Sequence, residues 1–162
     1  MTIKMDRAAP AVSVQIATRA GGVPRSARFR HWALAALGQR AEITVRVVTA
    51  PEARSLNHRY RGKDYATNVL SFSYEAGRMR RGDIVRGDIV LCATVVSREA
   101  REQRKSPGAH YAHLTVHGIL HLRGYDHETP AAARTMERHE RRILRGLGYP
   151  DPYLPTRASE RA

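Results

Sequence analysis

A cluster of histidines between residues 117 and 127 constrains this chain more than any other feature. His117 and His121 stand four residues apart, and His127 follows shortly after them. On a helix, residues four apart lie on one face with Cβ atoms ~5–6 Å apart. Gly124 is the expected end of that helix, because glycine adopts the left-handed cap conformation without steric cost. Once the chain turns there, His127 reaches the same point. Three neutral imidazoles and one open position form the donor set of a catalytic zinc site.

A fourth histidine, His113, lies one turn before His117 on the same helix face. Eight residues separate His113 from His121, about 12 Å at ~1.5 Å per residue, whereas Zn–N bonds measure ~2.0–2.1 Å. One zinc ion therefore binds either His113 with His117 or His117 with His121. The third ligand must come from beyond the helix end, which is nearest His121. The sequence thus predicts one zinc ion per chain, bound by His117, His121 and His127, with His113 in the cleft or beside a ligand.

The histidine spacing also resembles that of the metzincin metalloproteases, with one departure. Those enzymes carry a glutamate directly after the first histidine, where it acts as general base. Here that position is Gly118, which cannot transfer a proton. The plain alternative to a metal site is a group of ordinary surface or core imidazoles, and the spacing together with Gly124 disfavours it.

The chain carries a large excess of positive charge. Of its 162 residues, 28 are Lys or Arg and 15 are Asp or Glu, which gives a net charge of +13. Solubility alone needs a net charge of only ~2–8 on a small domain. The excess therefore predicts a polyanionic partner, and nucleic acid is the favoured class.

The cysteine content and the apolar runs indicate a cytoplasmic protein that does not cross a membrane. Cys92 is the only cysteine, so no intrachain disulfide can form, in agreement with a reducing compartment. It follows an apolar run, which predicts a buried thiol. The N-terminal residues lack the apolar stretch of a signal peptide, and no run approaches the ~18 apolar residues of a membrane span.

The order of strand and helix patterns predicts an α+β fold with a mixed four-stranded sheet and helices packed on it. Thr49 and Thr129 are the expected N-caps of two helices. Leu56 and Tyr60 are expected on the inner face of the first of these helices, and Glu140 belongs to the largely apolar stripe of the second, with Met136 and Leu144. Gly82-Asp-Ile-Val is repeated at Gly87, and the second copy is the expected strand because it leads directly into the next helix. The expected strands are 12–17, 43–48, 67–74 and 87–92, and the expected helices are 24–37, 51–60, 94–105, 109–123 and 130–147. These elements form one domain over residues 1–153. A loose tail covers residues 154–162, with the chain expected to loosen from Pro150 onward.

Beyond its spacing, the segment His117-Gly-Ile-Leu-His-Leu-Arg-Gly-Tyr-Asp-His127 resembles the signature of the YbeY family, the bacterial rRNA-maturation endoribonucleases. The upstream segment Leu56-Asn-His-Arg-Tyr-Arg-Gly-Lys-Asp64, followed by Thr67-Asn-Val-Leu-Ser-Phe72, is similar to a second motif of that family, and Leu147-Gly-Tyr149 also fits. Many members have proline where Ala66 stands. The similarity runs from about Ile43 to Tyr153.

This resemblance implies a zincin-like metal site in a cleft beside the sheet edge. It implies a zinc-dependent, single-strand-specific endoribonuclease that acts in maturation of the 16S rRNA 3′ end and in ribosome quality control. The implied partners are single-stranded RNA, rRNA and ribosomal particles. Two other classes stay open: a zincin-type metallopeptidase or amidohydrolase, and a non-enzymatic ribosome-associated zinc protein. The missing glutamate disfavours the first, and the open coordination position disfavours the second.

Arg61 is the candidate catalytic residue outside the histidine cluster. Phosphodiester cleavage needs positive charge at the non-bridging oxygens, and the planar fork of a guanidinium matches a phosphate. Arg61 stands at the expected end of a short helix, before Gly62, and so is able to project into a cleft. The resemblance carries a catalytic arginine onto this position. The alternatives are an ordinary surface arginine at 61 and a catalytic role for Arg59.

Several further residues have two interpretations each. Asp126 either orients an imidazole or caps the turn before His127. Ser71 and Phe72 face either the cleft or the core. Four basic residues either contact phosphates or belong to a solvated face: Lys63, Arg80, Arg81 and Arg123.

Overall fold

A computed structural model describes residues 9–75 and 82–154, and its centre is a mixed four-stranded sheet. The strands are β1 (Ala11–Ile16), β2 (Ala41–Val48), β3 (Val69–Ser73) and β4 (Val85–Cys92). Their order across the sheet is β1-β2-β4-β3. β1, β2 and β4 run parallel, and β3 pairs antiparallel with β4 at the edge. The α+β class and the mixed four-stranded sheet predicted from the sequence are confirmed.

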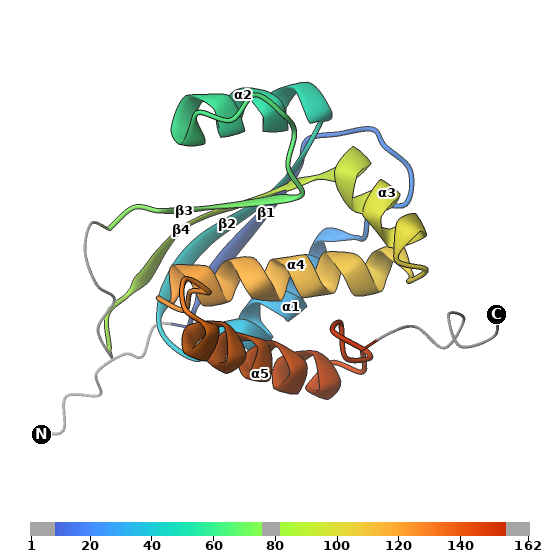
Figure 1. The fold of residues 1–162 in the computed structure, drawn as a ribbon. Helices are drawn as coiled ribbons and strands as arrows, with labels where there is room; N and C mark the ends of the chain where they lie inside the picture. Colours follow the sequence, from blue (N-terminus) through green and yellow to red (C-terminus); the bar gives the residue numbers. More distant parts are fainter. Residues whose placement is uncertain (1–8, 76–81, 155–162) are drawn as a thin grey trace, which may run out of the picture.

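Helices cover both faces of this sheet (Figure 1). They are α1 (Ser26–Leu37), α2 (Ala50–Arg61), α3 (Ala93–Glu102), α4 (Pro107–Leu122) and α5 (Pro130–Gly146). In Figure 1, α2 lies above the sheet, α1 and α4 lie beneath it, and α5 packs on the outer side of α4. No helix in the described part of the chain combines the length and the apolar character needed to cross a membrane.

The two faces of the sheet contribute to two apolar clusters of unequal size. The larger one joins the sheet to α1 and α4 and includes Phe29, Trp32, Ile89, Tyr111, Ile119 and Leu120. The smaller one lies under α2 and consists of Val48, Ala53, Leu70, Val90, Cys92 and Val95. Strand β4 contributes to both clusters, as expected for a parallel strand covered on both faces. The buried thiol predicted for Cys92 is confirmed.

Helix α4 begins earlier than the sequence suggested. Pro107 and Gly108 were expected to separate two helices, but they form the first turn of α4. Ser106 is the N-cap, and its hydroxyl accepts a hydrogen bond from the Ala109 amide at 3.1 Å. Proline fits the first helical position because its missing N–H would have no partner there. The early start adds a capped first turn ahead of the histidines.

Two other local expectations were wrong. Pro24 was expected inside the first turn of α1, but the helix begins at Ser26 with Arg25 as its N-cap. Tyr60 was expected on the inner face of α2, but 61% of it is exposed. Ala53 and Asn57 form the buried stripe of α2 instead, and Tyr60 lies beside this stripe, where solvent reaches its ring.

The repeated Gly-Asp-Ile-Val segment is a strand in its second copy, as predicted. Strand β4 already begins at Val85, the last residue of the first copy. Gly87 opens the second copy beneath the backbone of β3. A Cβ atom at this position would lie 2.3 Å from the Phe72 carbonyl oxygen and 2.9 Å from Leu122 Cδ2. Only glycine therefore fits where β3, β4 and α4 meet.

Candidate metal centre

The end of α4 and the following turn bring three histidines together. His117 and His121 lie on adjacent turns of α4, with ring centroids 4.6 Å apart. The helix ends at Leu122, and Gly124 adopts a φ of 99°, which only glycine adopts without strain. The chain then returns His127 to within 5.0 Å of the His121 ring and 5.7 Å of the His117 ring. One ring nitrogen from each histidine lies within 4.8 Å of the other two.

The geometry and charge of this cluster fit a zinc ion. The Nε2 atoms of His117 and His121 are 3.1 Å apart, close to the ~3.3 Å between two tetrahedral ligands with bonds of ~2.0–2.1 Å. Burial, and then the charges of His117 and His127, lower the pKa of His121 to about 4. His121 is therefore neutral at neutral pH, as a metal ligand must be. His127 is exposed, so the cluster is open to solvent on its side.

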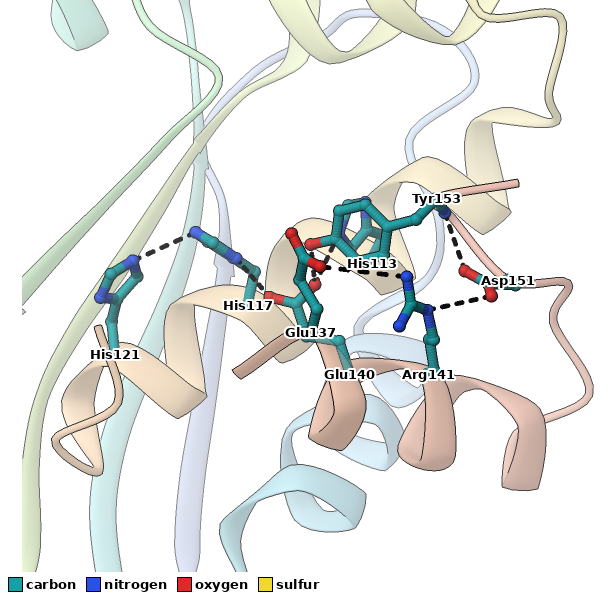
Figure 2. A network of polar contacts seen from close by, with 8 residues as sticks. All are labelled: His113, His117, His121, Glu137, Glu140, Arg141, Asp151 and Tyr153. Carbon is teal, nitrogen blue, oxygen red and sulfur yellow. Dashed lines mark hydrogen bonds and ion pairs between the residues drawn. The ribbon is translucent and has the colours of Figure 1, made fainter. Parts of the chain in front are cut away.

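A buried carboxylate stands behind the cluster. Glu140 of α5 is 0% exposed, and its Oε1 lies 2.5 Å from His117 Nδ1. Its Oε2 accepts a hydrogen bond from the Tyr153 hydroxyl and lies 3.0 Å from His113 Nε2 (Figure 2). Burial acts to raise the pKa of Glu140, but these hydrogen bonds and the charge of His117 outweigh it and lower the pKa to about 2. The charged carboxylate thus holds the His117 proton on Nδ1 and leaves Nε2 free for a metal.

His113, His117 and Glu140 form a second group whose ligand atoms lie within 4.8 Å of one another. In this group, however, the histidine nitrogens are already hydrogen-bonded to the carboxylate, and Tyr153 closes the remaining side. His117 belongs to both groups through different nitrogens. The three-histidine group is therefore the one able to hold a metal with an open position, and the Glu140 group orients one of its ligands.

Sequence reasoning missed Glu140 and Tyr153 as site residues. Glu140 was recognised only as a member of the stripe that faces the core, between Met136 and Leu144. Its charge inside an apolar stripe was the signal that could have identified it, because a buried carboxylate needs hydrogen-bond or charge partners.

The segment after α5 was expected to loosen from Pro150, and up to Leu154 that expectation was wrong. Asp151 forms an ion pair with Arg141 at 3.0 Å, and the Arg141 guanidinium lies 5.2 Å from the Tyr153 ring centroid. The ion pair is drawn in Figure 2, which also shows the Tyr153 hydroxyl at Glu140. The segment lines a cavity of about 940 Å³ together with residues of α4 and α5. The remainder of the expected tail, residues 155–162, lies outside the described residues.

Close packing explains the glycine that follows the first ligand. A Cβ atom on Gly118 would lie 2.8 Å from Ile89 Cδ1 and 3.2 Å from Ser71 Oγ. The Ser71 hydroxyl also donates a hydrogen bond to the Gly118 carbonyl oxygen at 3.3 Å. α4 lies flush against β3 and β4 at this point. Any side chain at position 118 would therefore require Ile89 to shift, and Gly118 leaves the centre without the general-base glutamate of a metallopeptidase.

Arg61 lies on the other side of strand β3 from α4. It is exposed, is the last residue of α2, and precedes Gly62, whose φ is 67°. It lines a cavity of about 570 Å³ together with Ser71, the residue that also contacts Gly118. Within the described parts of the chain, no hydrogen bond or ion pair occupies its guanidinium. Arg59 is also exposed but does not line this cavity.

Of the remaining candidate residues, two have structural roles and the others have none that the structure shows. Asp126 caps the turn, because its Oδ1 accepts a hydrogen bond from the Glu128 amide at 3.1 Å. Arg123 donates to the Ala36 carbonyl oxygen at 2.7 Å, so its guanidinium serves the packing of α1. Lys63 is exposed. Arg80 and Arg81 lie outside the described residues.

Comparison with known proteins gives a consistent result over most of the chain. The model of the family described as Endoribonuclease YbeY matches residues 26–148. A protein of Aromatoleum aromaticum named Endoribonuclease YbeY is 57% identical over 130 residues, which are 80% of this chain and 81% of that protein. A protein of the same name from Thiobacillus denitrificans is 52% identical over 142 residues, 88% of this chain and 95% of that one. A solution structure from Thermotoga maritima, 22% identical in sequence, has a TM-score of 0.47 over 88% of this chain and 99% of its own. On the family match and the two relatives, this chain belongs to the YbeY endoribonuclease family.

Proposed function

We propose that this protein is a zinc-dependent, single-strand-specific endoribonuclease, a metal-dependent hydrolase of the cytoplasm. Its proposed task is maturation of the 16S rRNA 3′ end and ribosome quality control. The observation that carries the hydrolase chemistry is the group of facing imidazoles from His117, His121 and His127, backed by the buried carboxylate of Glu140. The names of the relatives support RNA as the substrate.

Each residue of the centre has a separate task in this proposal. His117, His121 and His127 would hold one zinc ion, which supplies a Lewis acid for a phosphoryl oxygen and lowers the pKa of a coordinated water. Glu140 keeps the His117 ring in the tautomer that binds metal, and Tyr153 keeps Glu140 in place. Gly118 contributes no proton acceptor, so the centre depends on charge stabilisation more than a peptidase does.

Arg61 is the proposed catalytic residue. An uncommitted guanidinium pairs with a phosphate through two parallel hydrogen bonds and neutralises the charge that grows on its oxygens. Its exposure at the end of α2 and its place in a cavity shared with Ser71 support this role.

The charge of the chain supports the proposed partners: single-stranded RNA, rRNA and ribosomal particles. A net charge of +13 attracts a phosphate backbone and gives no advantage with a peptide substrate. The metallopeptidase alternative is further disfavoured because position 118 is glycine, and even a Cβ atom there would lie 2.8 Å from Ile89 Cδ1. We assign this activity to one domain over residues 1–153.

One experiment compares the three classes of function. Zinc-loaded protein is incubated with matched single-stranded and duplex RNA and with a peptide library, in the presence and absence of a chelator. We expect cleavage of the single strand alone, abolished by the chelator. Peptide hydrolysis with intact RNA would refute the nuclease proposal, and binding of RNA without any hydrolysis would favour a non-enzymatic zinc protein.

A further inference from the structure

The cavity that contains Arg61 is an open groove with aromatic walls. It lies on the α2 side of the sheet edge and has a volume of about 570 Å³. We call it the aromatic groove. Its lining residues are Arg46, Leu56, Tyr60, Arg61, Ser71, Phe72, Ser73, Tyr74, Asp88 and Val90. Exposed aromatic residues gathered in one hollow mark a binding surface more often than isolated ones do.

Two tyrosines of this groove are fixed at one edge and open on the rest of their surface. The Tyr60 ring packs against Phe72 with centroids 5.2 Å apart, and 61% of Tyr60 is exposed. The Tyr74 hydroxyl donates a hydrogen bond to Asp88 Oδ1 at 2.5 Å, and 62% of Tyr74 is exposed. Rings held in this way offer preorganised flat faces. Such faces stack on nucleobases, and every base has a π-face to offer.

The charges in the groove fit a phosphate beside these rings. Arg46 is committed to Glu52 at 2.7 Å and to Gln15 at 3.1 Å. Arg61 has no hydrogen bond or ion pair within residues 9–75 and 82–154. The groove therefore combines open aromatic faces with one uncommitted cation, the pairing found where proteins bind single-stranded nucleic acid.

The groove also lies close to the metal centre across a single strand. β3 is one of the two edge strands of the sheet, with α2 on one side and α4 on the other (Figure 1). Ser71 of β3 lines the groove, and its hydroxyl contacts the carbonyl oxygen of Gly118, the residue next to His117. A flexible polymer is thus able to occupy the groove and pass around the sheet edge to the histidines.

We propose that the aromatic groove is a subsite for unpaired nucleobases of RNA, in which Tyr60 and Tyr74 stack on the bases next to the phosphate that Arg61 contacts during cleavage. This inference rests on the proposed function and adds a reason for single-strand specificity. In a duplex the base faces are stacked on their neighbours and are not offered to a protein ring, whereas an unpaired strand is able to splay its bases onto aromatic side chains.

The test measures binding of labelled 2′-O-methyl oligouridine to the zinc-loaded protein by fluorescence anisotropy. A gel run after each titration verifies that the oligonucleotide is intact. We expect Tyr60→Leu and Tyr74→Leu each to weaken binding by roughly 5- to 150-fold, the effect of losing one base–aromatic stack. Tyr74→Phe keeps the ring and should keep most of the affinity. Tyr65→Leu is the matched control, because Tyr65 is 53% exposed but lies outside the groove.

A second arm changes the RNA and leaves the protein intact. An oligonucleotide of the same length and charge carries 5,6-dihydrouracil, whose ring is not planar and stacks poorly. It should bind the wild type more weakly than oligouridine, and Tyr74→Leu should lose less affinity from this change than the wild type does. Thermal unfolding of each variant verifies its fold.

The outcomes separate this inference from the proposed function. If the wild type binds and cleaves single-stranded RNA while both leucine variants and the dihydrouracil RNA bind with unchanged affinity, the subsite is refuted and the nuclease stands. If the wild type neither binds nor cleaves single-stranded RNA, both proposals fall together.

Discussion

His117 uses its two ring nitrogens for different partners, and this division decides which neighbour shares the proposed metal. Nδ1 faces Glu140 at 2.5 Å, and Nε2 faces His121 Nε2 at 3.1 Å. We therefore expect His121→Ala to lose its zinc and His113→Ala to retain about one zinc per chain. Elemental analysis of the purified variants measures this directly. An empty His113→Ala protein beside a fully loaded His127→Ala protein would show that the ligand choice is wrong.

Arg61 is the proposed catalytic residue outside the three histidines. Arg61→Ala should fold and bind zinc normally, because the side chain is exposed and makes no contact with the histidines that would hold the ion. Its RNA cleavage should fall by ~10²–10³, the cost of removing one donor that stabilises charge in a transition state. Cleavage rates and zinc content are measured on the same preparations, with Arg59→Ala as the matched control. If Arg59→Ala is inactive and Arg61→Ala is not, the catalytic role belongs to Arg59.

At the scale of elements, the segment after α5 supports the candidate metal centre through Glu140. Tyr153 donates a hydrogen bond to Glu140, which in turn orients His117. Tyr153→Phe should therefore weaken zinc binding by about 10-fold, at the lower end of the effect of removing a partner of a metal ligand. A competition titration with a chromophoric chelator measures the change.

The control for Tyr153 is a second tyrosine of the same region. The Tyr149 hydroxyl bonds to Arg28 at 2.7 Å and does not touch Glu140. Tyr149→Phe should leave the zinc affinity unchanged. If both variants lost zinc affinity equally, the segment would affect zinc binding only through the stability of the fold.

Helix α4 makes the metal-free protein sensitive to acid. Burial and neighbouring charges lower the pKa of His121 to about 4, against ~6.5 in an unfolded chain. Below pH ~6.5 the unfolded state therefore binds more protons, so stability is full above that pH and falls as the pH drops toward 4. After allowance for solvent screening we expect a loss of about 1–2 kcal/mol. Urea unfolding of the metal-free protein at several pH values tests this, and His121→Gln should show a shallower decline.

At the scale of the whole molecule, the net charge of +13 should govern the affinity for RNA. Each phosphate neutralised on a single strand contributes about −0.7 to the slope of log affinity against log salt concentration. Several contacts would therefore reduce the affinity by orders of magnitude between low and moderate salt. Binding isotherms of single-stranded RNA over a series of salt concentrations give the slope. A slope near zero would contradict an electrostatic contribution from this charge.

The sequence by itself determined the features that depend on neighbouring residues. The spacing of His117 and His121 places both imidazoles on one helix face, and Gly124 ends that helix with a positive φ. Thr49 and Thr129 cap the helices that follow them, as predicted, by accepting backbone hydrogen bonds within one turn. These interactions span only a few residues, so local rules of helix geometry are sufficient to predict them.

Only the tertiary structure decided what lies around the histidines. Glu140 reaches His117 from 23 residues away, and Tyr153 reaches Glu140 from a segment whose composition suggested a loose end. The need for glycine at position 118 depends on how closely α4 approaches Ile89 in the sheet. The exposure of Tyr60 depends on which stripe of α2 the sheet covers. Each of these features arises where separate elements pack together, and burial, hydrogen bonding and steric fit at such contacts are set by the whole fold rather than by any one stretch of the chain.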